Sequence, residues 1–100
     1  MFQNKRFITR GVDKSLPPEI QILIWNSIDS MSVEKDYIQF FTIEVFSEFI
    51  AIEHKQEVPE YKNMFYILGN FENYFKDKTE IKIFAIDDGM YSTMLLSSEY

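Results

Sequence analysis

The sequence predicts an α+β fold in which an antiparallel sheet of five or six strands packs against one main N-terminal helix. Apolar residues recur every three or four positions between residues 18 and 30, and they alternate with polar residues in several later segments. A chain of 100 residues is long enough for one hydrophobic core but not for two, and 46% of its residues are hydrophobic. We therefore expect a single domain spanning residues 1–100.

The first third of the chain predicts a strand followed by the main helix. Residues 6–12 suit a short strand that ends at Gly11. A helix over residues 18–30 follows, because proline is tolerated in a first turn and Glu19 complements the positive end of the helix dipole. Ile22 and Trp25 lie off the apolar stripe of this helix. They could form either a second contact with the core or the interface of a homodimer. The stripe itself consists of Ile20, Leu23, Ile24, Ile28 and Met31.

The remainder of the chain predicts strands and one short helix. Residues 37–46, 49–57 and 62–68 are rich in aromatic and β-branched residues, which favour strands. Asn70 is expected to cap a short second helix that carries Phe71, Tyr74 and Phe75, and residues 77–79 are expected to form a loop. The final elements are a central strand over 80–86, apolar on both faces, a turn over 87–90 and a last strand over 91–97. The same order of elements also fits a small, partly open Sm-like or SH3-like barrel, and periodicity does not choose between sheet and barrel.

Charge and composition exclude several classes of protein. The formal net charge is −6, and it is uneven: residues 1–14 carry four basic residues and one acidic residue, a net of +3, so the rest of the chain carries −9. Such an acidic body disfavours generic nucleic-acid binding. The chain has no cysteine, which excludes disulfides and cysteinyl zinc sites. No segment approaches the roughly 20 apolar residues of a membrane span, so we expect a cytoplasmic protein.

The residues required for familiar catalysis are missing. His54 is the sole histidine, and the three glycines are isolated, so neither a nucleophilic triad nor a phosphate-binding loop is predicted. We expect His54 to be a hydrogen-bonded or half-exposed strand residue. Asp87 and Asp88 are expected to form a turn rather than a cation site. The prediction is therefore a non-enzymatic protein with no cofactor and no metal.

Aromatic and acidic side chains are the features most suggestive of binding. Phe, Tyr and Trp make up 17% of the chain, more than a small core needs, and protein interfaces are enriched in them. Phe40, Phe41, Phe84 and Trp25 are expected in the core, whereas tyrosines such as Tyr66 and Tyr91 are candidates for the surface. Glutamates also gather along the strands over 37–57 and their flanks, either as a solvated face or as a negative ridge that meets a basic partner. These glutamates are Glu44, Glu48, Glu53, Glu57 and Glu60.

Several sequence blocks in a fixed order resemble one known family. The blocks are Arg6–Val12, Leu16–Gln21 with Trp25, Asp36–Phe41, His54–Tyr61, Ile86–Gly89 and Ser92–Leu96. Together they resemble the small staphylococcal, streptococcal and enterococcal proteins catalogued as domain of unknown function 960, and the segment 69–78 lies outside the resemblance. The resemblance implies a Gram-positive origin and genes on mobile elements beside those of proteins that act on DNA. It supplies no catalytic residues.

Two functions follow as hypotheses. The first is a protein-interaction module, a regulator or inhibitor of a nucleic-acid-processing protein. The alternative is a small barrel that binds nucleic acid through the basic region Lys5–Lys14 and exposed aromatics. For the first hypothesis we expect an interaction surface composed of Trp25, Glu53, His54, Glu57, Glu60 and Tyr61.

Overall fold

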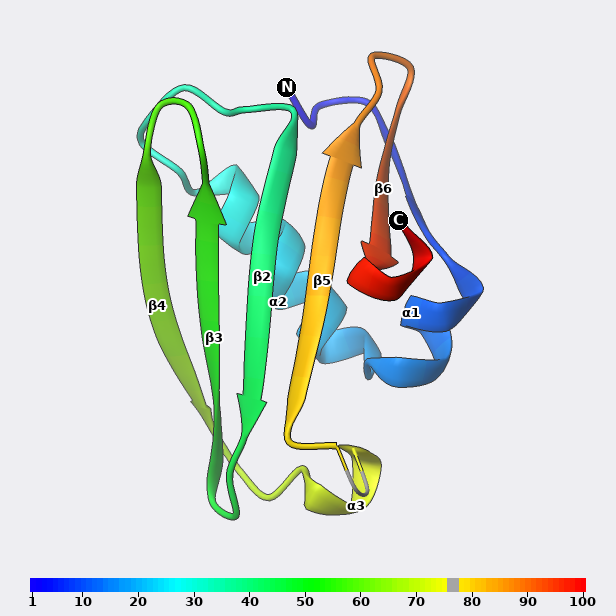
Figure 1. Cartoon of the computed structure of the whole chain (residues 1–100), viewed down its shortest axis with the longest axis vertical. Coiled ribbons are helices and arrows are strands. Elements are labelled where there is room, and N and C mark those ends of the chain that lie inside the picture. Colours follow the sequence, from blue (N-terminus) through cyan, green and yellow to red (C-terminus); the bar gives the residue numbers. More distant parts are fainter. Residues whose placement is uncertain (76–77) are drawn as a thin grey trace.

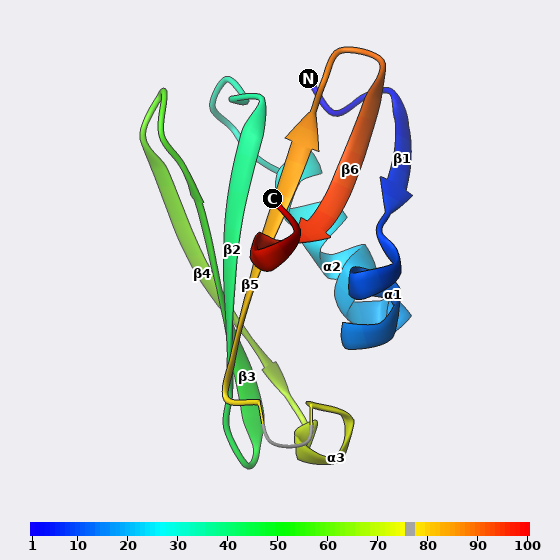
Figure 2. The ribbon, with the colours of Figure 1, turned by 45° about the vertical axis from the view of Figure 1, so that its right-hand side comes forward.

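A computed structural model, which describes residues 1–75 and 78–100, contains a twisted six-stranded sheet with helix α2 packed across one face (Figures 1 and 2). Helix α1 lies beside the end of β1, and the short helix α3 lies at the far end of the sheet. The two chain termini lie near the same side of the molecule. In chain order the elements are β1 (Lys5–Ile8), α1 (Arg10–Ser15), α2 (Pro18–Asp29), β2 (Ile38–Val45), β3 (Phe49–Gln56), β4 (Tyr61–Leu68), α3 (Glu72–Phe75), β5 (Glu80–Asp87), β6 (Tyr91–Leu96) and the 3-10 helix η1 (Ser97–Glu99).

The sheet is open rather than closed into a barrel. Its strand order is β1-β6-β5-β2-β3-β4, with β1 and β4 at the two edges. All neighbouring strands are antiparallel except β1 and β6, which run parallel. The predicted α+β fold with a sheet of five or six mostly antiparallel strands is therefore confirmed, with six strands and one parallel pair, and the barrel alternative is excluded. The predicted central position of the strand over 80–86 is also confirmed, because β5 has neighbours on both sides.

The core lies between α2 and the sheet face turned toward it, which we call the inner face. Helix α2 begins with Pro18 at its first position and buries Ile20, Ile24 and Ile28, as its spacing predicts. Strand residues alternate between the two faces, so the inner face receives every second side chain. The buried apolar residues of β2, β3 and β5 on this face are Phe41, Ile43, Ile50, Ile52, Ile81, Ile83 and Ala85.

The predicted strand over 6–12 was wrong beyond residue 8. The hydroxyl of Thr9 accepts a hydrogen bond from the Val12 N–H at 3.2 Å and caps the N-terminus of α1. The same hydroxyl donates to the Glu99 carboxylate at 2.7 Å, and that carboxylate also lies against Gly11, where a Cβ would approach it to 2.6 Å. The helix therefore depends on a contact with the opposite end of the chain. The last strand likewise ends at Leu96, one residue before its expected end, and passes into η1.

The segment after β4 agrees with its prediction where the structure describes it. The side chain of Asn70 accepts a hydrogen bond from the Glu72 N–H at 3.0 Å, and α3 buries Phe75. Of the predicted loop, Lys78 and Thr79 lie outside helices and strands, whereas Asp77 lies outside the described residues. Within the described part of the chain, no helix is both long and apolar enough to cross a membrane.

Candidate functional site

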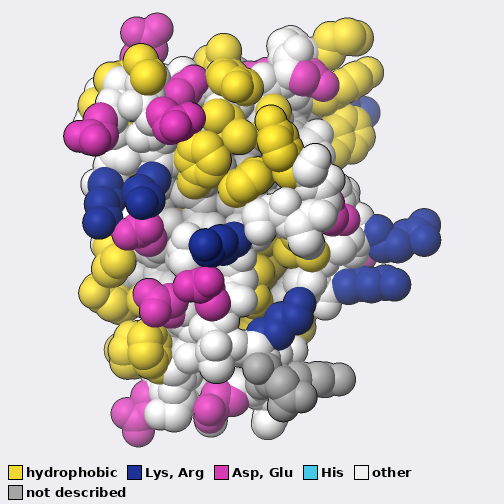
Figure 3. All heavy atoms as spheres, viewed as in Figure 1, with side chains coloured by type: hydrophobic (Ala, Val, Ile, Leu, Met, Phe, Trp, Pro, Cys, Tyr) yellow, Lys and Arg dark blue, Asp and Glu magenta, His cyan; other side chains and the backbone are white. Residues whose placement is uncertain are grey.

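The sheet face turned away from α2, which we call the outer face, carries the second set of alternating side chains. Figure 3 shows this face, with hydrophobic side chains gathered over its upper part and lysines and carboxylates below and beside them. Phe40 and Phe84 belong to this face and are half-buried, so their predicted place in the core was wrong, whereas Phe41 on the inner face is buried. The reason is the alternation of side chains along a strand: the neighbouring residues Phe40 and Phe41 of β2 point to opposite faces of the sheet.

A hollow of about 390 Å³ opens on the outer face. Strand pairing places Lys55, Phe40 and Phe84 in one row across β3, β2 and β5. Thr42 and Lys82 are opposite each other in the next row. Because the side chain of Thr42 is short and those around it are long, a depression forms between the rows. Its lining residues are Phe40, Phe41, Thr42, Lys55, Gln56, Glu57, Lys82 and Phe84, and we call this depression the outer-face pocket.

The outer-face pocket combines an aromatic surface with ammonium groups. The rings of Phe40 and Phe84 meet edge to face, with 5.2 Å between their centroids. Lys55 is 3.6 Å from the Glu53 carboxylate, which Lys62 also approaches to 3.3 Å. Lys82 makes no ion pair with any carboxylate that the structure describes. The pocket can therefore hold an apolar side chain and a negative charge at the same time.

The predicted glutamate ridge is interrupted. Glu48 lies in the turn between β2 and β3, whereas Glu57 and Glu60 lie in the turn between β3 and β4, at the opposite end of β3. Between them, Glu53 is engaged by two lysines. Glu44 lies opposite Glu80 of β5, so the carboxylates fall into separate groups rather than one row along these strands.

His54 is buried, so its predicted place in an interaction surface was wrong. Its side chain is fully enclosed beneath α2 and stacks on Phe41, with 4.2 Å between ring centroids. Its Nδ1 is 2.7 Å from the Ser27 hydroxyl, and its Nε2 is 2.7 Å from Oε1 of Gln39. The expected hydrogen bonding of His54 is confirmed, but the increasing polarity of β3 reflects a buried polar network rather than an exposed strand end.

The hydrogen bonds of two glutamines determine which nitrogen of His54 carries the proton. The Gln56 amide donates to the carbonyls of Glu34 and Pro59, so its Oε1 is left to accept from the Gln39 amide at 2.7 Å. Oε1 of Gln39 must then face His54 as an acceptor, which places the imidazole proton on Nε2 and leaves Nδ1 to accept from Ser27. Burial lowers the pKa of His54 to about 4, so the ring is neutral at pH 7.

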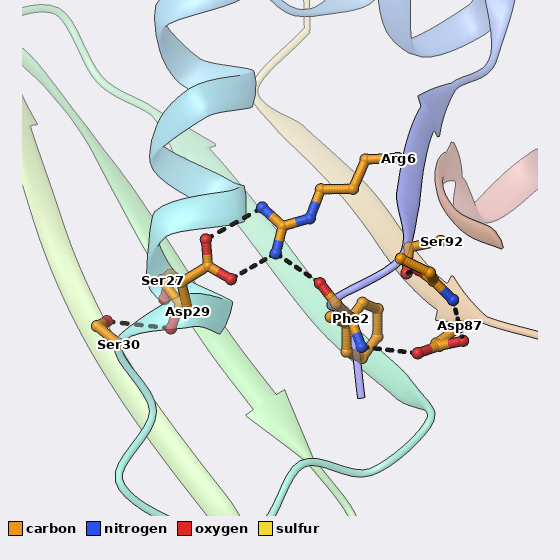
Figure 4. Close-up of polar contacts among 8 residues, drawn as sticks. Phe2, Arg6, Ser27, Asp29, Ser30, Asp87 and Ser92 are labelled. Carbon is orange, nitrogen blue, oxygen red and sulfur yellow. Dashed lines mark hydrogen bonds and ion pairs between the residues drawn. The ribbon is translucent and has the colours of Figure 1, made fainter. Parts of the chain in front are cut away.

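A second polar cluster ties the N-terminal segment to the sheet (Figure 4). Phe2 is buried, and its N–H donates to the Asp87 carboxylate at 2.6 Å. Arg6 donates to the Phe2 carbonyl at 2.8 Å and pairs with both carboxylate oxygens of Asp29. Burial favours a raised pKa for Asp87, but hydrogen bonds from Phe2, Gly89 and Asn4 outweigh it and lower the pKa below its usual value. We call Phe2, Asn4, Arg6, Asp29 and Asp87 the N-terminal latch.

Replacing Asp87 by alanine is expected to release the N-terminal latch and to lower the free energy of unfolding by about 2 kcal/mol, because buried donors lose a charged acceptor. Urea unfolding followed by the fluorescence of Trp25 measures the change. Trp25 reports on the latch because its ring lies 4.8 Å from the Arg6 guanidinium. Glu60→Ala removes the same charge from an exposed turn and should change stability by less than about 0.5 kcal/mol. Equal effects of the two substitutions would contradict the role of the latch.

The six residues predicted for the interaction surface are not assembled at one place. Trp25 lies on α2 beneath the Arg6 guanidinium, near edge strand β1. Tyr61 is partly buried and meets the ring of His54 edge to face at 5.2 Å. Glu57 and Glu60 are exposed near the opposite edge of the sheet. Sequence reasoning did not identify the pocket residues Lys55, Lys82, Phe40 and Phe84 as a site; their shared feature, lysine and phenylalanine on the same face of adjoining strands, requires the pairing of β2 with β5.

Comparison with known proteins gives a family and a fold. Residues 5–99 match a family model described as staphylococcal protein of unknown function, domain of unknown function 960. The chain is also similar to a solved structure of a protein of unknown function from Enterococcus faecalis, with a TM-score of 0.81 and 23% sequence identity. That match covers 97% of this chain and 91% of the other. No curated protein matches the sequence.

Proposed function

The chain belongs to the family catalogued as domain of unknown function 960, and we propose that it acts as a non-enzymatic protein-interaction module that binds its partner at the outer-face pocket. The single observation that supports this function is the pocket itself, in which Lys55 and Lys82 flank the Phe40–Phe84 ring pair. Aromatic residues are enriched in protein interfaces, and most of the binding energy there comes from a few side chains that fill well-packed pockets.

The chemistry of the pocket selects the kind of segment that it accepts. The two rings offer apolar contact, and the ammonium group of Lys82, which makes no ion pair among the described residues, favours a carboxylate nearby. The ammonium group of Lys55 lies 3.6 Å from the Glu53 carboxylate and so contributes less. Glu57 at the rim contributes one opposing charge, which favours a ligand that also offers an N–H group. We therefore propose that the partner inserts an acidic segment with an aromatic or aliphatic side chain.

The proposed role is that of a regulator or inhibitor of a nucleic-acid-processing protein, encoded on a mobile genetic element. The net charge of −6 supports a protein target over nucleic acid, because a nucleic acid brings one phosphate per nucleotide to the acidic body, whereas a protein segment can place a single carboxylate at Lys82. Of the four basic residues in the N-terminal region, Arg6 is engaged by Asp29 and by the Phe2 carbonyl, which leaves the exposed Lys5, Arg10 and Lys14 for the nucleic-acid alternative.

A random peptide library displayed on phage tests the proposed site. Selected peptides are expected to combine Asp or Glu with an aromatic or aliphatic residue, and to shift the backbone NMR signals of β2, β3 and β5. Lys82→Glu is expected to weaken their binding by about tenfold, because it reverses a charge that the peptide carboxylate meets. The matched control is Lys14→Glu, which makes the same charge change at an exposed position of α1.

Two outcomes would contradict the proposed function. One is that selected peptides bind Lys82→Glu as tightly as the unchanged protein, and the other is that they shift signals of α2 but not of the sheet. A single-stranded oligothymidylate provides the comparison with nucleic acid. Binding of this oligonucleotide at about 50 mM salt that weakens as salt rises would favour the nucleic-acid alternative instead.

A further inference from the structure

Strand β4 is a sheet edge with exposed apolar side chains. It runs for eight residues, pairs with β3 on one side, and is the last strand in the sheet order. On the outer face its side chains Met64, Tyr66 and Leu68 are 43%, 62% and 85% exposed. An edge of this length and composition offers unpaired backbone groups to another strand.

The register with β3 shows which backbone groups of β4 are free. The N–H of Gly69 donates to the Glu48 carbonyl, and the ladder continues from there without a bulge to Gln56 and Tyr61. In an antiparallel ladder, hydrogen-bonded and non-hydrogen-bonded positions alternate. The odd-numbered residues of β4 therefore point their N–H and C=O groups toward β3. Four residues point theirs toward the open edge: Lys62, Met64, Tyr66 and Leu68.

Of the devices that usually prevent pairing between molecules, this edge carries a single lysine. Strand β4 contains no proline, and its register with β3 has no bulge. Lys62 is its one charged residue, and the Glu53 carboxylate 3.3 Å away partly balances that charge. Although the whole chain is acidic, the strand itself contains no Asp or Glu, so like charges do not oppose each other along it.

We propose that β4 pairs with β4 of a second copy of this chain, antiparallel and about a two-fold axis at Phe65. This register places Lys62 opposite Leu68 of the second copy and Met64 opposite its Tyr66. It uses all four outward-facing residues in hydrogen-bonded pairs and keeps the two lysines at opposite ends of the seam. Each methionine sulfur then lies beside a tyrosine ring, a favourable contact.

A second copy is the occupant that these observations favour because the strand is complementary to itself. A two-fold axis at Phe65 overlaps the full span 62–68 with itself and leaves no charged residue facing another of the same sign. The pairing joins two six-stranded sheets edge to edge and leaves the outer-face pocket open. It also differs from the homodimer seam expected at Ile22 and Trp25, where Trp25 already packs against Arg6.

Light scattering and hydrogen exchange on the unchanged protein test this pairing. At about 0.5 mM we expect a mass twice the 12.0 kDa of the monomer, and at about 1 μM the monomer mass. Over the same range, the amides of Lys62, Met64, Tyr66 and Leu68 should become at least about tenfold slower to exchange. A monomer mass at both concentrations would overturn the proposal, and so would a dimer in which these four amides still exchange rapidly.

Substitutions then separate backbone pairing from side-chain contact. Met64→Pro removes an N–H that faces the open edge but none that pairs with β3, and it should abolish the dimer. Met64→Thr keeps the N–H and should retain at least part of the dimerisation. Tyr66→Glu, which brings two negative charges to the seam, provides a second disrupting variant should Met64→Pro fail to fold. Met90→Glu, in the exposed turn after β5, is the control and should dimerise like the unchanged protein. Dimerisation of Tyr66→Glu at unchanged strength would refute the seam.

Discussion

Replacing His54 by alanine is expected to lower the free energy of unfolding by about 4 kcal/mol, a large part of the stability of a domain of this size. The substitution removes a fully buried ring that stacks on Phe41, and it leaves a cavity beneath α2. It also leaves Oε1 of Gln39 without its donor, since the Gln39 amide group is already used by the Asp36 carbonyl and by Gln56. Urea unfolding followed by Trp25 fluorescence measures the loss.

Lys55→Ala provides the control for this substitution. Lys55 is the next residue of β3 but points to the outer face, where its ion pair with Glu53 is exposed and contributes little. We expect it to change the free energy of unfolding by less than about 0.5 kcal/mol. A cost below about 1 kcal/mol for His54→Ala would show that the polar network does not hold α2, the sheet and the segment 34–36 together.

Acid is expected to destabilise the protein through the same histidine, by about 3 kcal/mol between pH 7 and pH 4. The pKa of His54 is about 4 in the folded protein but about 6.5 in the unfolded chain, so the unfolded chain binds this proton first. The stability that this group contributes is therefore fully present above pH 6.5, and it is lost as the pH falls toward 4. Free energies of unfolding from urea titrations at several pH values give the profile.

The carboxylates contribute in the same direction at lower pH, so a variant is needed to isolate the histidine. The pKa values of Asp29 and Asp87 lie below their usual range, which means that their contributions are lost as the pH falls through acidic values. His54→Gln does not titrate and can still accept from Ser27 and donate to Gln39. The difference in stability between the two proteins should shrink by about 3 kcal/mol from pH 7 to pH 4. A difference that does not change with pH would contradict the low pKa.

Local patterns predict the elements whose contacts are local. The apolar spacing of Ile20, Ile24 and Ile28 predicts α2. The aromatic and β-branched residues of 37–46 and 49–57 predict β2 and β3, which are joined where the Phe46 N–H donates to the Phe49 carbonyl. In contrast, local pattern places residues 10–12 of α1 in a strand. Its capping residue Thr9 and its Gly11 both contact Glu99, and no window of nearby residues contains that contact.

The candidate sites could not be predicted from the sequence, because their residues meet only once β2, β3 and β5 have paired. Gln39, His54 and Gln56 are polar residues on mostly apolar strands, and as separate residues they indicate exposure. They meet as a buried network because β2 and β3 place them on the inner face, where Ser27 of α2 completes it. The outer-face pocket required in addition that β5 lie beside β2, although about 40 residues separate these strands in the chain.

The parallel pairing of β1 with β6 has a kinetic consequence. Lys5 pairs with Tyr91, so 86 positions (91 − 5) separate the partners, whereas the hairpins of β2, β3 and β4 close over a few residues. Closing so long a loop carries a large entropic cost until the intervening chain has collapsed. We therefore expect the antiparallel strands β2, β3 and β4 to pair first and β1 to dock against β6 last. During synthesis on the ribosome, the N-terminal segment emerges first and must wait for almost the whole chain before its partner exists.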